Sequence, residues 1–138
     1  MASWIPDVES KLFTLIKHKG EKELKEKYPN IYYTTDNESS TQTHYPTVYI
    51  HFLPNDERGQ DLDGISINAF LCSLQLEVTV SKSQGQAVAK KVMWNAIESL
   101  KELGFNVFQM PEFIETGNDT KRMIARARRL FGSGDEIG

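Results

Sequence analysis

The chain has 138 residues, which fits one domain that can bury a real core. Its composition is ordinary for a soluble globular protein, with 39% hydrophobic residues, 25% charged residues and a formal net charge of −3. The single cysteine, Cys72, excludes an internal disulfide. No apolar run reaches the length of a membrane span, and the first residues lack the pattern of a signal peptide, so we expect a chain made in a cytoplasm.

The N-terminal part predicts one helix and two strands. Apolar residues at helical spacing predict a helix over 5–18, and Gly20 is expected to end or interrupt it. Residues 21–28 predict a short solvated helical turn. Aromatic and β-branched residues predict strands at 31–35 and 47–53.

Two polar segments follow these strands, at 36–45 and 54–64, and neither has helical or strand periodicity. Both are rich in turn-forming residues and long for loops of a compact domain. Loops of this kind often contact partners, so we treat 36–45 and 54–69 as candidate contact regions. The acidic candidates in the second region are Asp56, Glu57, Asp61 and Asp63.

The clearest periodicities lie in the middle of the chain. Residues 70–80 alternate between apolar and polar side chains, which predicts a strand with one face in the core. The period then changes, and an apolar stripe predicts a helix over about 84–103. Ser83 and Gln86 fit a capping box at its start, and Gly104 is expected to stop it.

The C-terminal part predicts two more strands, at 105–110 and 122–131, joined by a turn over 111–119 that begins with a proline. The predicted order is α-β-β-β-α-β-β. We therefore expect an α+β domain over residues 1–132, with one mixed, mainly antiparallel sheet of about five strands and the helices on one face. Residues 133–138 are expected to form a flexible tail.

The last predicted strand gathers an unusual amount of positive charge. The segment KRMIARARRLF has one lysine, four arginines and no acid. Because residues two apart share a face of a strand, Arg122, Arg126 and Arg128 are expected on one face with Ile124 and Leu130. Met123, Ala125, Ala127 and Phe131 are expected on the other, which is apolar except at Arg129.

Three interpretations of this arginine face stay open. In water the repulsion between such neighbours is only about 0.6 kcal/mol, so a solvated face is acceptable. Alternatively, the arginines contact a neighbouring copy, where Glu112, Glu115 or the loop acids are possible partners. A third alternative is that they face a channel that carries DNA. Arginine is suited to contact with a neighbouring copy and to contact with DNA, because its planar guanidinium group can donate two hydrogen bonds to one carboxylate or phosphate.

No catalytic or metal-binding motif appears in the sequence. His18, His44 and His51 have no metal-ligand spacing, and DLDG at 61–64 lacks the further ligands of a calcium loop. No glycine-rich phosphate loop follows a strand, and Cys72 lies on the predicted core face. We therefore expect no enzyme activity, no metal and no cofactor.

One combination of motifs resembles a known family. A strand LQLEVTV is followed by a serine-rich cap, an amphipathic helix ending in LGF, a strand ending in MPEF and a final strand RMIARARRLFG. Over about residues 62–132 this succession is similar to the tail terminator (tail completion) and related minor tail or neck proteins of long-tailed bacteriophages.

The resemblance implies a structural virion protein of the tail–neck region, assembled in the host cytoplasm. Such subunits typically form a hexameric ring that caps the tail tube, stops its growth and joins the head connector, while DNA passes through the centre without sequence reading. The expected partners are therefore further copies, the tube protein and a connector protein. Another neck component is the nearest alternative, and a nucleic-acid-binding module is a further one.

Overall fold

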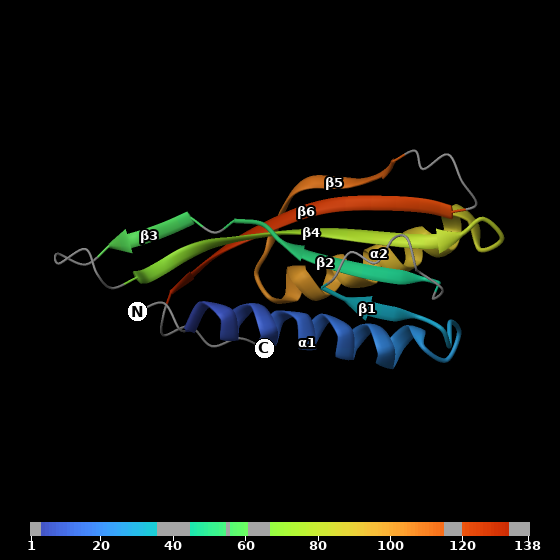
Figure 1. Ribbon diagram of the computed structural model, residues 1–138, viewed down its shortest axis with the longest axis horizontal. Helices are drawn as coiled ribbons and strands as arrows, with labels where there is room; N and C mark the ends of the chain where they lie inside the picture. The colour runs from blue at the N-terminus through green and yellow to red at the C-terminus, as the bar shows by residue number, and fades with distance from the viewer. Residues whose placement is uncertain (1–3, 36–44, 55, 61–66, 115–119, 133–138) are drawn as a thin grey trace.

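The computed structural model describes residues 4–35, 45–54, 56–60, 67–114 and 120–132 (Figure 1). Its elements follow the order α1-β1-β2-β3-β4-α2-β5-β6. Five strands lie side by side in the order β1-β2-β4-β6-β5, and among them only the pair β1–β2 is parallel. The predicted α+β class is thereby confirmed, with two helices and a mixed, mostly antiparallel sheet.

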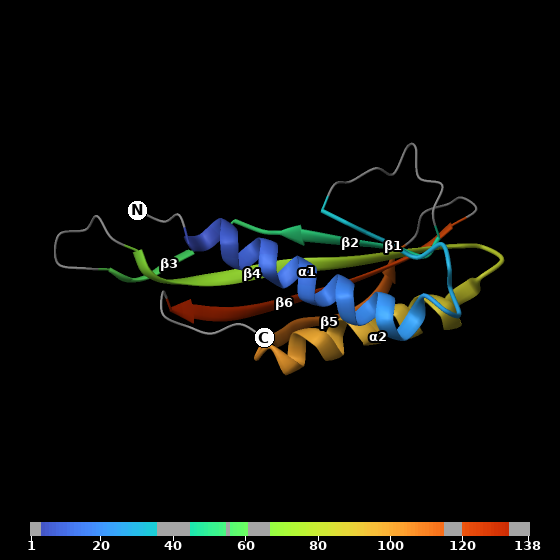
Figure 2. The same cartoon turned by 90° about the horizontal axis from the view of Figure 1, so that it is seen from below.

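Both helices lie on the same side of the sheet (Figure 2). The central strand β4 (Ile67–Ser81) turns its even-numbered side chains toward them, and from Phe70 to Val80 these are all buried. The facing stripe of α2 (Gly85–Glu102) is also buried, as the apolar periodicity predicts. Burial of this apolar surface is the main stabilising contribution to the fold.

Helix α1 (Trp4–Leu24) continues through Gly20, so the prediction that this glycine ends or interrupts the helix is wrong. Gly20 is buried and faces Tyr33 of strand β1 (Tyr32–Thr34). A Cβ at this position would overlap the Tyr33 hydroxyl and ring. The glycine is there because the helix and the tyrosine approach closely, and not because the chain turns.

The end of α2 follows its prediction, but its start does not. Gly104 has a φ of +87°, and the amides of Gly104 and Phe105 donate to the carbonyls of Lys101 and Leu100, a Schellman ending. At the start no side chain caps the helix, so the predicted capping box is wrong. Instead, the Ser81 amide donates to Oε1 of Gln84 at 3.2 Å.

A strand occupies part of the segment expected to be a polar loop. Strand β3 (Asp56–Gln60) pairs with the beginning of β4, on the same edge as β2 (Thr47–Phe52). Phe52 lies opposite Leu74 and Asp56 opposite Leu71, so the β2–β3 side has one extra residue, as in a bulge. A polar edge strand held by backbone pairing has no apolar alternation, which is why the sequence did not reveal it.

Strand β5 (Asn106–Ile114) also runs further than predicted, because it continues past Pro111. It forms the edge of the sheet, and its pairing with β6 (Thr120–Gly132) has two register shifts. Proline is tolerated at such edge and bulge positions because its missing N–H is not needed for pairing. Residues 36–44 of the expected loop at 36–45 and the expected tail at 133–138 lie outside the described residues. Neither described helix contains an apolar stretch of the length that a transmembrane segment requires.

Candidate functional site

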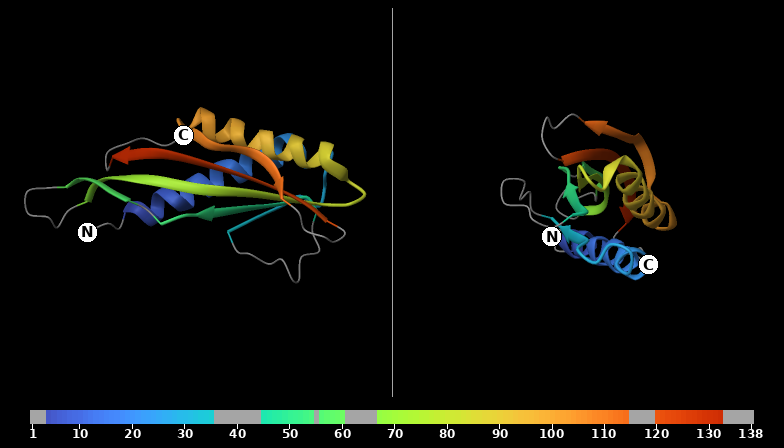
Figure 3. Two further views of the ribbon diagram at one scale, coloured as in Figure 1. Left: turned by 90° about the horizontal axis from the view of Figure 1, so that it is seen from above. Right: turned by 90° about the vertical axis from the view of Figure 1, so that its right-hand side faces the viewer.

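The side of the sheet that faces away from the helices is here called the open face (Figure 3). Strand β6 divides as predicted: Met123, Ala125, Ala127 and Phe131 are buried on the helix side. The open face receives Arg122, Arg126 and Arg128, whose partners across β4 are the polar residues Thr79, Gln75 and Ser73. The predicted arginine face is therefore present.

Arg129 lies on the helix side of β6, and it has a structural role. Its Nη1 donates to the carbonyl oxygen of Leu103 at 2.8 Å, at the end of α2. Its guanidinium carbon also lies 4.3 Å from the ring centroid of Phe131. A cation at the carbonyl end of a helix is favourable because the helix dipole is negative there. Arg129 thus joins α2 to the sheet.

Two of the three open-face arginines have partners within the chain. Arg126 lies directly opposite Gln75, and its Nε donates to Oε1 of Gln75 at 2.8 Å. Gln75 in turn donates to Glu77 at 3.0 Å. Nη1 of Arg122 lies 3.4 Å from Oε1 of Glu77, its diagonal neighbour on β4. These four side chains form a connected polar network in which Glu77 balances part of the charge.

Arg128 differs from the other two. Its cross-strand neighbours, Ser73 and Asn106, carry no charge. Among the described residues its guanidinium makes no hydrogen bond or ion pair, and it lies 4.9 Å from the ring centroid of Phe108. Arg128 is exposed, and Phe108 is 44% exposed. This pair therefore presents a positive charge and an aromatic surface together.

The acids expected as partners for the arginines lie in several parts of the chain, and their pairing with a neighbouring copy stays a prediction. Glu112 lies on β5 and accepts a hydrogen bond from Nε2 of Gln109 at 3.0 Å. The backbone of Asp56 and Glu57 belongs to β3. Glu115, Asp61 and Asp63 lie outside the described residues. The acid that the sequence analysis missed is Glu77, which alternation had placed on the correct face but which only the strand register brings to Arg122.

Strand β2 adds two aromatic rings to the open face. Tyr49 and His51 lie opposite Glu77 and Gln75. Their rings stack with centroids 5.6 Å apart and an interplanar angle of 10°. The open face thus has arginines on β6 and aromatic rings on β2 and β5, a composition that is favourable for contact with another molecule.

Charge is distributed unevenly along the chain. All 16 basic residues lie in the described ranges, whereas eight of the 19 acidic residues lie outside them. The described residues therefore carry a net charge of +5, although the whole chain is at −3. Six of those eight acids belong to the segments 36–44, 61–66 and 115–119, which connect strands. The chain therefore offers both signs of charge for association.

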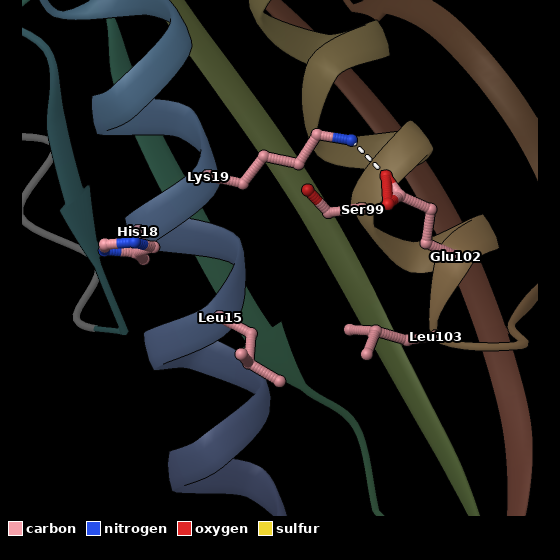
Figure 4. Close-up of a pocket in the computed structure, with 6 residues that line it drawn as sticks. All are labelled: Leu15, His18, Lys19, Ser99, Glu102 and Leu103. Atoms are coloured by element: carbon pink, nitrogen blue, oxygen red, sulfur yellow. Dashed lines mark hydrogen bonds and ion pairs between the residues drawn. The ribbon is translucent and has the colours of Figure 1, made fainter. Parts of the chain in front are cut away.

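A groove of about 350 Å³ lies between the two helices, on the side opposite the arginines (Figure 4). Lys19 of α1 and Glu102 of α2 form an ion pair across it. The hydrogen bond from Lys19 to Glu102 raises the pKa of the lysine. The pair bridges the helices at the surface, where solvent screens it, so its contribution to stability is small.

The remaining candidates of the sequence analysis are the three histidines and Cys72. No group of three or more potential ligands within the described ranges is arranged to hold a metal ion. His51 is exposed on β2, His18 lines the helix groove and His44 lies outside the described residues. Cys72 is fully buried, and burial raises the pKa of its thiol to about 12. A thiol of this kind is a poor nucleophile.

The comparisons with known proteins neither support nor contradict the resemblance to the phage tail proteins. No protein-family model matches the chain, and no curated protein matches it significantly. The assignment of a function therefore depends on the residues and the geometry described above.

Proposed function

We propose that the chain is a structural virion protein, a tail terminator that caps the tail tube of a long-tailed phage as a hexameric ring. In this role it ends tail elongation and provides the surface to which the head is joined. The observation that carries the proposal is the open face of the sheet. Helices protect one side of the sheet, and the other side presents arginines and aromatic rings that have no covering element among the described residues.

A closed ring requires two different patches on each subunit, because each copy contacts the next head to tail. The charge distribution meets this requirement. The open face offers Arg128 with Phe108, and the strand connections offer acids without any basic residue. Opposite charges on separate patches favour the head-to-tail arrangement and disfavour contact between two identical patches.

The order of the elements agrees with what the resemblance implies, namely a helix, paired strands, a second helix and two final strands. The nearest alternative within the same particle is another neck or head–tail connector component. A nucleic-acid-binding module is less favoured, because Arg122 and Arg126 already have partners within the chain. DNA passing through the ring would then meet a surface that does not read sequence.

Deletion of the gene in the parent phage tests the proposal. Electron microscopy of the lysate should show filled heads beside unattached tails of abnormal length. Empty or leaking heads with normal tails would instead favour the connector alternative. Infectious particles formed without the chain would refute both.

A second test uses purified protein. Native mass spectrometry should detect rings of the chain alone or on isolated tails, and the double variant Arg126→Glu/Arg128→Glu should form them less readily. Filter binding with duplex DNA separates the nucleic-acid alternative, since a dedicated binder would show tight, strongly salt-dependent binding. Ring formation unchanged by the double variant would mean that the open face is a solvated surface.

A further inference from the structure

The three arginines of the open face are not equivalent, and this difference identifies a narrower site. Arg122 and Arg126 belong to the network with Glu77 and Gln75, so a partner would have to replace existing contacts. Arg128 has no such contact among the described residues and rests on an exposed ring, Phe108.

Exposed apolar side chains also occur elsewhere on the same two strands. Met110 on β5 is 60% exposed, and Leu130, two residues beyond Arg128 on the same face of β6, is 54% exposed. Among the large apolar side chains described in the sheet, only Phe108, Met110 and Leu130 are exposed. Arginine, aromatic residues and methionine are enriched in the energetically dominant parts of protein interfaces.

We infer that Arg128, Phe108 and Leu130, here called the Arg128 patch, form the contact that receives a carboxylate of a second copy of this chain. The inference depends on the proposed function and assigns one side of its subunit interface. The guanidinium would bind an acidic side chain from a strand connection of the neighbour, and the apolar side chains would be buried around it. Burial lowers the local dielectric and strengthens the charge pair.

A second copy is the occupant that the charges favour. Every acid outside the described ranges lies in a segment without lysine or arginine, so each copy carries acidic segments that complement the patch. Binding of a nucleic-acid strand would require several neighbouring cationic side chains, each able to contact a phosphate without losing another polar partner. Of the three arginines that β6 places on the open face, however, Arg122 and Arg126 already have polar partners within the chain.

Reversal of the charge gives the first test. Arg128→Glu should weaken self-association by at least about tenfold, measured by sedimentation of the free chain and by binding to isolated tails. The matched control is Lys91→Glu, which makes the same change of charge at an exposed position of α2. Circular dichroism should show that both variants fold. Equal association of the two variants would overturn the inference.

Chemical cross-linking gives a second test, which detects the contact itself and does not depend on a loss of association. Arg128→Lys keeps the positive charge and adds an amine that a carbodiimide links to a carboxylate in contact with it. With a mixture of ¹⁵N-labelled and unlabelled chains, mass spectrometry should find links from position 128 to an acid of the other copy. Arg126→Lys, whose site is already occupied by Gln75, should give far fewer such links.

The outcomes separate the two proposals. If rings form on tails but position 128 couples to no other copy, the inference is wrong and the proposed function stands. If deletion leaves normal tails while position 128 still couples between copies, the contact is real and the proposed function is wrong. If Arg128→Glu abolishes binding of DNA and leaves self-association intact, the patch belongs to nucleic acid and the inference is refuted.

Discussion

Replacement of Gly20 by alanine is the sharpest test of the packing between α1 and the sheet. In an unconstrained helix interior this change would stabilise the protein by up to about 1 kcal/mol, because glycine is a poor helix former. Here the new methyl group would overlap the Tyr33 hydroxyl and Cζ and lie 3.1 Å from Cε1. The two effects have opposite signs, so the measured sign decides between them.

We expect the cost of the overlap with Tyr33 to exceed the gain from the helix preference of alanine. Tyr33 is only 4% exposed and belongs to the core, so its ring has no free space into which it can move. Forcing an extra methyl group into a packed core typically costs about 1–3 kcal/mol. After subtraction of the helix gain, we expect Gly20→Ala to lower the free energy of unfolding by about 1–2 kcal/mol.

Urea denaturation followed by circular dichroism measures this difference. The control is the same substitution in the background Tyr33→Leu, which lacks the overlapping ring atoms. There the helix preference acts alone, and Gly20→Ala should stabilise the protein by up to about 1 kcal/mol. Stabilisation by Gly20→Ala in the presence of Tyr33 would refute the close approach of helix and strand.

Three further predictions concern other contacts. Glu77→Gln should lower the free energy of unfolding by about 1 kcal/mol and should have less effect in the background Arg122→Gln, as a double-mutant cycle in urea would show. Arg129→Met should cost about 1–2 kcal/mol by the same assay, because it removes the hydrogen bond to the end of α2 and the contact with the Phe131 ring. Burial raises the pKa of the Cys72 thiol to about 12, and it also raises the pKa of the Tyr33 hydroxyl, so the unfolded chain loses these protons first. Stability should therefore be complete below about pH 9 and fall as the pH rises toward 12, and Cys72→Ala should reduce the slope of the unfolding free energy against pH.

Much of the fold could be predicted because the strongest signals in the sequence are periodic. The alternation over residues 70–80 placed Cys72 and its even-numbered neighbours in the core, and the same reasoning placed Arg122, Arg126 and Arg128 together on the other side. A period of two is a direct consequence of strand geometry, so it does not require knowledge of the neighbouring strands. The end of α2 at Gly104 could also be predicted from the local sequence, because the positive φ of a helix ending favours glycine.

Three of the wrong predictions share a physical cause, because each depends on contacts between distant segments. Gly20 looked like a helix end, but its role is set by Tyr33 across the core. Strand β3 has no apolar pattern and exists through its backbone pairing with β4. Pro111 looked like a strand end, but an edge position accepts it.

The sequence by itself determined which arginines share a face, since that follows from alternation along a single strand. Only the tertiary structure decided which of them have partners. The register of β6 against β4 brings Gln75 to Arg126 and Glu77 to Arg122, and it leaves Arg128 between uncharged neighbours beside the Phe108 ring. Pairing register depends on the whole sheet, and a shift of one residue would have exchanged every contact on the open face.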